Sequence, residues 1–252
     1  MPQSTFPGST SAWNGLARHD FTLDAWKAIL VKPRQALPGN PWIWRAQFFD
    51  RWPAVDIVLV REGFHLAWIN VSGLFGAPEA GRRFDAFYGF LTETFGLAQQ
   101  VVLEGFSRGG LDVYRWAARW PERVCCIYGD APVCDFKSWP GAKNGSVHPA
   151  DWAECLKAYG LTEAEANRYP GNPIDNLAPL AAHGIPIIHV CGDADLSVPL
   201  DENTAIVQDR YTKLGGRIEV ILKPGGGHHP HSLEDPRPVV DFILSAWSNR
   251  KG

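Results

Sequence analysis

Short apolar runs alternate with segments of helical spacing along most of the chain. The apolar runs predict strands at residues 27–32, 65–70, 101–103, 124–128, 185–191 and 218–222. Helical spacing predicts helices at residues 53–62, 78–95, 111–120, 202–214 and 238–247. Strands that alternate with helices in this way form a mostly parallel, doubly wound sheet with helices on both faces. The pattern therefore predicts an α/β fold and a single domain over residues 1–252.

The interval from Cys134 to Gly184 interrupts this alternation. It is rich in aromatic residues and contains two short helical patterns, one over residues 149–159 and one that starts near Thr162. Because it lies between two predicted strands, we expect a small cap or lid insertion over residues 134–184 that covers the site. An ordinary crossover enlarged by surface loops is the alternative.

Composition narrows the classes of function. The chain has 252 residues, 45% of them hydrophobic, and a formal net charge of −3, which suits one domain with a full core. There is no basic stripe for nucleic acid and no apolar run long enough to span a membrane. The amino terminus lacks the basic and apolar regions of a signal peptide, so we expect a cytoplasmic protein, or a secreted or periplasmic one whose leader has been removed. The five cysteines show no paired spacing, and Cys125, Cys126 and Cys191, which lie in strand-like runs, are expected to be buried free thiols that pack in the core.

The sequence Gly105-Phe106-Ser107-Arg108-Gly109-Gly110 follows an apolar strand and opens a helix. This context predicts a nucleophile elbow, a sharp turn that exposes a serine and leaves little room for neighbouring Cβ atoms. We expect Gly105 and Gly109 to supply that room. The amide of Arg108, at the positive end of the following helix, would donate to a developing oxyanion. The alternative is a glycine-rich turn with an incidental serine.

Two aspartates follow the strand at residues 185–191. Asp195 lies three residues before Val198-Pro199, and this spacing favours Asp195 as the acid that orients a catalytic histidine. Asp193 is then expected to brace the turn.

Three histidines follow the last predicted strand. His228 comes directly after the glycines at 225–227, which allow a close approach to the serine, so it is the predicted base and His229 is the second choice. His231 is expected to fix the loop or line the site. The cluster also raises the possibility of a metal, but no E-x-x-H or C-x-x-C pattern accompanies it. We therefore expect neither a metal nor an organic cofactor.

The motifs around Ser107, Asp195 and His228 resemble those of the α/β-hydrolase superfamily, over nearly the whole chain. The resemblance implies these residues as nucleophile, acid and base in the chain order of that superfamily. The segments 41–45 and 137–141 look like a bacterial subgroup grouped with esterases and prolyl-oligopeptidase-like proteins. One departure is that the usual H-G oxyanion loop is absent. Residues 32–42 stand in its place, and the prolines at 33, 38 and 41 have no N–H to donate.

The substrate is the least determined part of the function. Residues expected near the site could stack on a sugar or bind a carboxylate: Trp42, Trp44 and Trp139 for stacking, and Arg45, Arg108 and Lys137 for the carboxylate. The alternative is that these tryptophans pack in the core or the cap. The prediction is a serine esterase acting on a small-molecule or carbohydrate ester of the acetyl type. A peptidase-like hydrolase is less favoured because no propeller or gating domain precedes the fold. A lyase or a non-hydrolytic binding protein on the same fold is the remaining alternative.

Overall fold

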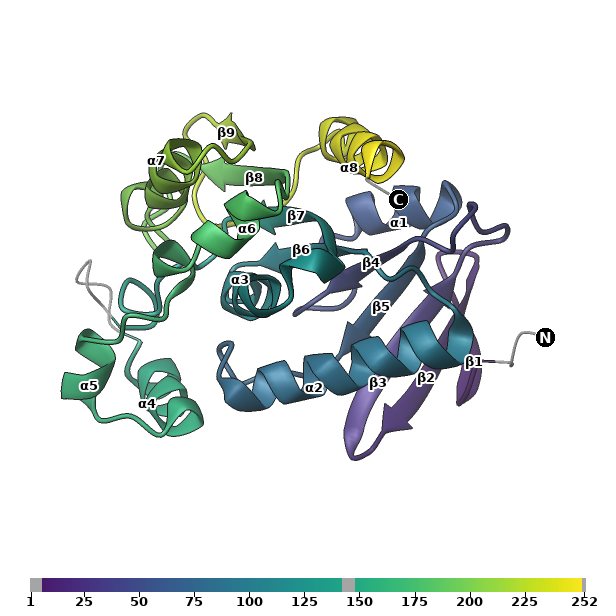
Figure 1. Ribbon diagram of the computed structural model, residues 1–252, viewed down its shortest axis with the longest axis horizontal. Helices are drawn as coiled ribbons and strands as arrows, with labels where there is room; N and C mark the ends of the chain where they lie inside the picture. Colours follow the sequence, from purple (N-terminus) through teal and green to yellow (C-terminus); the bar gives the residue numbers. More distant parts are fainter. Residues whose placement is uncertain (1–5, 142–147, 251–252) are drawn as a thin grey trace.

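The computed structural model describes residues 6–141 and 148–250. These residues form one sheet of nine strands in the order β1-β2-β3-β5-β4-β6-β7-β8-β9 (Figure 1). The strands are β1 (Ser9–Trp13), β2 (Leu16–Leu23), β3 (Trp26–Lys32), β4 (Trp42–Arg45), β5 (His65–Ile69), β6 (Val101–Phe106), β7 (Val124–Asp130), β8 (Ile187–Gly192) and β9 (Ile218–Lys223).

The strands from β5 to β9 in this order are parallel, whereas β1, β2 and β3 pair antiparallel with each other and β3 pairs antiparallel with β5. Parallel neighbours bring the carboxyl ends of β4, β6, β7 and β8 to one edge of the sheet, where ligands bind in folds of this kind. The predicted mostly parallel α/β fold is confirmed.

Helices cover both faces of the sheet (Figure 1). One face packs against α2 (Pro78–Gly89), α3 (Gly109–Arg119), α6 (Ala178–Ala182) and α7 (Thr204–Lys213), and the other against α1 (Ala54–Arg61) and α8 (Arg237–Asn249). A π-helical turn, η1 (Phe90–Thr94), follows α2, and 3-10 turns stand at η2 (Pro121–Arg123), η3 (Pro173–Asp175) and η4 (Leu200–Glu202). In the described part of the chain, no helix combines the length and the apolar character needed to cross a bilayer.

The segment after β7 carries α4 (Pro149–Tyr159) and α5 (Glu163–Asn167), which lie at one end of the molecule, away from the sheet (Figure 1). An apolar cluster that includes Phe136 and Cys155 of this segment, with Phe75 and Leu111, packs it against the start of α3. Residues 142–147 of the predicted cap lie outside the described residues. That the segment acts as a cap stays a prediction.

The expectation that Trp42 and Trp44 bind substrate is wrong. Both belong to β4, and both side chains are completely buried. The ring of Trp44 stacks on Phe84 at 4.1 Å and on Trp42 at 5.3 Å, between the sheet and α2. Their size and burial make these rings part of the core, and neither can meet a ligand.

We expect Trp44→Ala to lower the free energy of unfolding by about 3–5 kcal/mol, because it leaves a large cavity in the core. The KM for an ester should change less than about twofold, since the ring is remote from substrate. Urea unfolding and steady-state kinetics measure the two quantities. Trp44→Phe is the matched control, because within the described residues the buried Trp44 Nε1 has no hydrogen-bond partner and loses nothing on removal. A large rise in KM with unchanged stability would contradict the core assignment.

Candidate active site

Ser107 occupies the sharp turn between β6 and α3. Its φ angle is +48°, in the left-handed region that side chains rarely adopt. The turn is held by the neighbouring strand: Ser107 N–H donates to the Asp130 carbonyl at 2.9 Å, and Val133 N–H donates to the Ser107 carbonyl at 2.9 Å. These bonds fix a strained serine at the carboxyl edge of the sheet, which is the geometry of a nucleophile elbow.

The glycines around Ser107 differ in how tightly they are enclosed. A Cβ at Gly105 would stand 2.8 Å from Val113 Cγ2, and one at Gly110 would stand 2.6 Å from the Val133 carbonyl oxygen. At Gly109 the nearest atom, Gln47 Cγ, is 3.4 Å away. The crowded positions are therefore Gly105 and Gly110, and the expectation that Gly109 supplies the room is corrected.

Gly105→Ala and Gly110→Ala should each destabilise the fold by at least about 1–3 kcal/mol, because backbone atoms or a packed valine must move. Gly109→Ala has space and is helical, so it should be close to neutral or slightly stabilising. Thermal unfolding of the three variants tests this ranking. Equal losses at positions 109 and 110 would contradict it.

The structure brings Ser107, His228 and Asp195 together. Ser107 Oγ lies 2.9 Å from His228 Nε2, and His228 Nδ1 lies 2.7 Å from Asp195 Oδ2. The Ser107 residue is 9% exposed and the His228 side chain 13% exposed, so the three groups are shielded but not sealed. In this arrangement the imidazole can take the hydroxyl proton, while the carboxylate orients the ring and stabilises the imidazolium that forms.

Asp195 is held as a carboxylate by its own loop. Its Oδ1 accepts hydrogen bonds from the N–H groups of Ser197 and Val198, both at 2.9 Å. Burial alone would raise the pKa of Asp195, but hydrogen bonds from His228 and from these two amides bring the pKa below its ordinary value. Asp195 is thus ionised at neutral pH and can orient a protonated Nδ1 of the imidazole.

Asp193 lies in the same loop but is directed elsewhere. Its Oδ1 accepts a hydrogen bond from Gly225 N–H at 2.7 Å, at the start of the histidine loop. The loop also sits against Gly192, where a Cβ would be 2.1 Å from the Gly226 carbonyl oxygen. Asp193 therefore joins the acid loop to the histidine loop, while the carboxylate beside His228 is that of Asp195.

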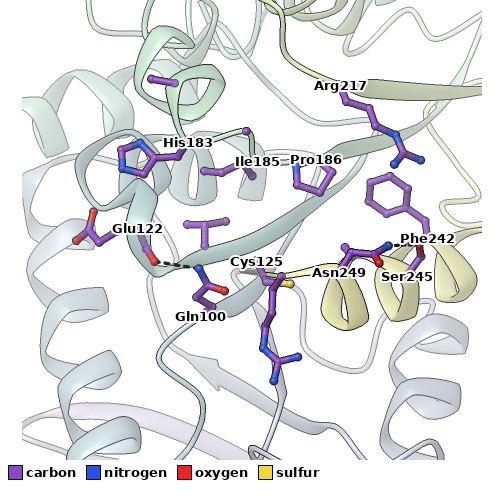
Figure 2. A pocket seen from close by; sticks show the side chains of 15 residues that line it. Gln100, Glu122, Cys125, His183, Ile185, Pro186, Arg217, Phe242, Ser245 and Asn249 are labelled. Atoms are coloured by element: carbon purple, nitrogen blue, oxygen red, sulfur yellow. Dashed lines mark hydrogen bonds between the residues drawn. The ribbon is translucent and has the colours of Figure 1, made fainter. Parts of the chain in front are cut away.

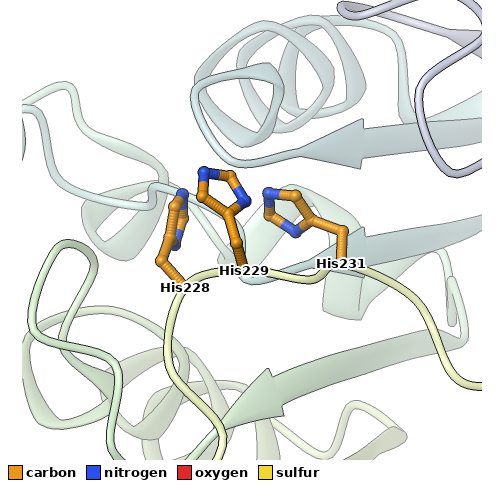
Figure 3. Close-up of side chains that lie close together, drawn as sticks. All are labelled: His228, His229 and His231. Carbon is orange, nitrogen blue, oxygen red and sulfur yellow. The ribbon is translucent and has the colours of Figure 1, made fainter.

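The three histidines of this loop lie side by side (Figure 3). His229 is exposed and stacks on Trp52 at 5.2 Å, and burial together with the charges of His228 and His231 lowers the pKa of His229. His231 is buried, and its Nδ1 lies 2.6 Å from Asp130 Oδ1 at the end of β7. His231 also meets the His228 ring edge-on at 4.9 Å, so the Asp130–His231 pair braces the loop that carries His228.

The three rings offer nitrogen atoms within 4.8 Å of one another, close enough to suggest a metal site. Both ring nitrogens of His228 already contact Ser107 and Asp195, however, and Nδ1 of His231 contacts Asp130. A tetrahedral metal with nitrogen ligands at about 2.0–2.1 Å would have to break one of the His228 contacts. The donor set therefore fits a proton relay better than a metal centre.

Arg45, predicted to bind substrate, is instead completely buried below the site. Its Nη1 lies 2.5 Å from Asp56 Oδ2 and 3.2 Å from Glu104 Oε1. Its Nε donates to the carbonyl oxygens of Gln47 and Phe48, both at 3.2 Å. The guanidinium is fully engaged in shaping the loop after β4, because a buried charge needs partners on every side.

This loop after β4, and not residues 32–42, is the one that approaches the elbow. Gln47 Cγ and Ala46 Cβ lie 3.4 and 3.6 Å from the position of a Cβ on Gly109. Gln47 Nε2 donates to Asp112 Oδ2 of α3 at 2.9 Å, which ties the loop to the helix behind Ser107. Residues 46–48 contain no proline, and they replace residues 32–42 as the early segment that lies beside Ser107.

Asp112 makes this tie sensitive to pH. Burial raises its pKa from 3.8 to about 7, against the hydrogen bonds that it accepts from Gln47 and Gly76 and the charges of Arg108 and Arg115. The folded state thus binds the Asp112 proton more tightly than the unfolded chain does between pH 3.8 and about 7. Its contribution to stability therefore falls as the pH rises through this window.

Asp112→Asn should remove the fall in stability that Asp112 causes as the pH rises, since the amide stays neutral and its oxygen can still accept a hydrogen bond from Gly76 N–H. The difference in unfolding free energy, variant minus wild type, should increase from pH 4 to pH 8 by up to roughly 4 kcal/mol, about three pH units at roughly 1.4 kcal/mol each. Urea unfolding across this pH range provides the measurement. A difference that does not change with pH would show that Asp112 ionises freely in the folded protein.

A hollow lies elsewhere on the molecule. It has a volume of about 530 Å³ and is lined by residues such as Gln100, Val124, Pro186 and Asn249, at the amino ends of β6, β7 and β8 (Figure 2). Two hydrogen bonds join residues of its lining, one from Gln100 Nε2 to the Glu122 carbonyl and one from Asn249 Nδ2 to Ser245 Oγ. It lies at the opposite edge of the sheet from Ser107 and is therefore separate from the candidate active site.

The chain is similar in fold to several solved structures. The fold is that of the α/β-hydrolases. The chain superposes on Est1E from Butyrivibrio proteoclasticus with a TM-score of 0.63 at 16% identity, covering 96% of this chain and 99% of that one. It also superposes on Pyrococcus horikoshii acylaminoacyl peptidase (TM-score 0.69, 14% identity, 94% of this chain) and Porphyromonas gingivalis dipeptidyl peptidase 4 (TM-score 0.68, 14% identity, 95% of this chain).

The chain spans 43% and 36% of the length of those two peptidase chains. No protein-family model matches the sequence, and a search of curated proteins finds no relative. At these identities the likeness establishes the α/β-hydrolase fold, and the chemistry must be argued from the site itself.

Sequence reasoning missed two contributors to the site. Gln47 lies just after β4, a strand too short to be distinguished from a loop. Asp130 ends an apolar run that the sequence does show, so its place at the carboxyl end of β7 was a usable signal. Of the predicted substrate residues, Trp139 is buried, 8% exposed, but its ring lies 5.2 Å from the guanidinium carbon of Arg108 and so stays beside the elbow.

Proposed function

We propose that this chain is a serine hydrolase that cleaves carboxylic esters through an acyl-enzyme on Ser107. One observation carries the proposal: the continuous hydrogen-bonded chain from Ser107 Oγ to His228 Nε2 at 2.9 Å and from His228 Nδ1 to Asp195 Oδ2 at 2.7 Å. The serine stands on a strained turn, which presents its Oγ at the edge of the sheet. Such a chain makes a serine hydroxyl nucleophilic at neutral pH.

The chemistry follows from these positions. His228 Nε2 takes the proton as Ser107 Oγ bonds to the acyl carbon, and Asp195 stabilises the imidazolium that forms. When the tetrahedral intermediate collapses, the bond to the alcohol oxygen breaks and His228 returns the proton to that oxygen. Water then attacks the acyl-enzyme with His228 again as base, releasing the acid and restoring Ser107.

The negative charge of the intermediate requires N–H donors, and two places can supply them. The first is the Arg108 amide at the amino end of α3, where the helix dipole favours negative charge. The second is the backbone of Gln47–Phe48. Arg45 binds the Gln47 carbonyl, and the N–H across a trans peptide bond points the opposite way from its carbonyl. The Phe48 amide thus points away from the Arg45 guanidinium.

A narrower proposal is an esterase for small acyl groups, such as acetyl, on carbohydrates. Of the three tryptophans predicted to stack on a sugar, Trp42 and Trp44 lie in the core. Trp139 is the one beside the elbow, with its ring near Phe75 at 6.0 Å and beside Arg108. Acetylated sugars compared with simple acetyl esters of the same leaving-group pKa test this narrower form, because stacking would lower KM for the sugar only.

Hydrolysis of p-nitrophenyl acetate in ¹⁸O-labelled water tests the general proposal. We expect a burst of p-nitrophenol equal to the enzyme concentration, followed by acetate that carries one labelled oxygen from water. A peptidase-like enzyme would prefer a matched peptide p-nitroanilide, whereas a lyase or a binding protein would release no labelled acetate. Absence of labelled acetate across a panel of simple esters would overturn the assignment.

A further inference from the structure

The side chain of Arg108, the residue after the proposed nucleophile, is held in an aromatic frame. Its guanidinium carbon lies 5.5 Å from the ring centroid of Phe48, 5.6 Å from that of Phe75 and 5.2 Å from that of Trp139. The three rings come from three separate segments: the loop after β4, the loop before α2 and the segment after β7. Ring faces attract a cation and restrict its orientation, so the guanidinium is positioned and partly shielded from water.

The charge of Arg108 is poorly neutralised. Among residues 6–141 and 148–250 its ion pair is with Asp151 of α4, at 3.5 Å between Nη1 and Oδ1. That distance is long for a charge-assisted hydrogen bond, which is usually about 2.7–2.9 Å. The Arg108 side chain is 26% exposed and that of Asp151 33% exposed, so the pair is open to water and to competitors. A guanidinium has five N–H donors, and one long contact leaves most of its capacity unused.

The donors of the neighbouring cations are more fully used than those of Arg108. Arg45 is buried against Asp56 and Glu104. Arg115 donates to the hydroxyls of Tyr159 and Tyr169. Lys137 donates to the Tyr169 carbonyl at 3.2 Å and stands 3.8 Å from Asp135. Of these four cations, Arg108 is the one that adjoins the serine and has N–H donors left for a ligand.

We propose that the Arg108 side chain binds a carboxylate of the substrate, so that the enzyme prefers esters bearing a free carboxylate close to the scissile bond. This inference rests on the proposed ester hydrolysis. The planar fork of the guanidinium pairs with a carboxylate through two parallel hydrogen bonds, displacing the long Asp151 contact. Asp151 makes a dianion such as a phosphate ester a poorer fit than a carboxylate, because it repels the larger negative charge more strongly.

The position of Arg108 limits where that carboxylate can be. The serine and the arginine are adjacent residues. The distance from the substrate carboxylate to the acyl carbon is therefore limited to about the length of an arginine side chain. It could belong to the acyl part, as in a half-ester of a dicarboxylic acid, or to the alcohol part, as in an acylated sugar acid. The shared chemistry is a carboxylate a few bonds from the ester.

Two matched ester pairs distinguish these sources. For the acyl side, mono-p-nitrophenyl glutarate is compared with p-nitrophenyl valerate. For the alcohol side, 4-acetoxybenzoate is compared with its methyl ester. We expect the charged member of one pair to have a kcat/KM at least about tenfold higher, as charge-assisted hydrogen bonds provide. Turnover of the neutral esters without preference for either charged member would overturn this inference and leave the ester hydrolase proposal intact.

Variants assign the preference to Arg108. Arg108→Gln should bring the charged-to-neutral ratio of kcat/KM close to one. If the substitution also disturbs the Arg108 backbone amide, both esters slow down equally, and the ratio does not change. Asp151→Asn should raise the ratio, because it removes the competing carboxylate. Arg119→Gln on the same helix, where Arg119 is 59% exposed and pairs with Asp85, is the matched control and should leave the ratio unchanged. An unchanged ratio in Arg108→Gln would contradict the proposal.

A binding measurement keeps the inference testable without turnover. Calorimetric titration of the Ser107→Ala protein with 4-acetoxybenzoate and with glutarate should show binding of one of them that Ser107→Ala/Arg108→Gln loses by at least about tenfold. If turnover is absent and this binding is present, the proposed function fails and the carboxylate site stands. If neither carboxylate binds, or both proteins bind equally, the carboxylate site is ruled out.

Discussion

Replacing Ser107 with alanine is expected to lower kcat for p-nitrophenyl acetate by at least ~10³-fold. The substitution removes the atom that forms the acyl-enzyme, while the oxyanion donors remain and keep a residual rate above that of water. Serine and alanine are strained alike by the backbone φ of +48° at position 107, so the melting temperature should change little. Stopped-flow and steady-state assays on the purified variant measure the loss.

Ser245→Ala on α8 is the matched control, because its hydroxyl accepts a hydrogen bond from Asn249 at the far edge of the sheet. It should retain the activity of the wild type. If Ser107→Ala kept its activity within tenfold of the wild type and was correctly folded, the serine would not be the nucleophile.

His228→Ala is expected to cost about as much as Ser107→Ala, because groups that act as one relay lose their function together. His229→Ala should cost far less, since the His229 ring is exposed and stacks on Trp52. His231→Ala should act mainly on stability by leaving the buried Asp130 with one fewer donor. The three alanine variants are to be assayed at pH 8, with circular dichroism to verify folding.

The order of these losses identifies the base. A larger loss of kcat in His229→Ala than in His228→Ala would mean that His229, and not His228, is the base. A loss in the Ser107→Ala/His228→Ala double variant no greater than in either single variant is expected for a relay. Multiplied losses would instead show two independent contributions.

Much of the fold follows from local patterns. The buried strands β6, β7 and β8 are continuous apolar runs, and their helices end at proline or glycine, so neighbouring residues suffice to locate them. β2 is different, because half of the residues of Leu16–Leu23 are polar, most of its side chains are only partly buried, and it lies between β1 and β3 in the antiparallel part of the sheet. β4 has only four residues, and its identity as a strand depends on pairing with β5 and β6. Such strands are defined by neighbours that are distant in sequence.

Local patterns likewise reveal some residues of the candidate site and not others. The patterns around Ser107, Asp195 and His228 are local turns, and the His228 side chain lies within hydrogen-bonding distance of both Ser107 and Asp195. The interpretation of Trp42, Trp44 and Arg45 as substrate residues is wrong because it depends on reading β4 as a loop. The aromatic frame around Arg108 joins three distant segments, so no local pattern could reveal it.

Covalent labelling with a fluorophosphonate tests the central claim most directly. This reagent reacts with serines activated by a neighbouring base and leaves a phosphonyl adduct on the hydroxyl oxygen. We predict one adduct per chain, located by peptide mass spectrometry on Ser107, absent in Ser107→Ala and formed far more slowly in His228→Ala. An unlabelled wild-type protein, or an adduct on another residue with Ser107 unmodified, would contradict the account.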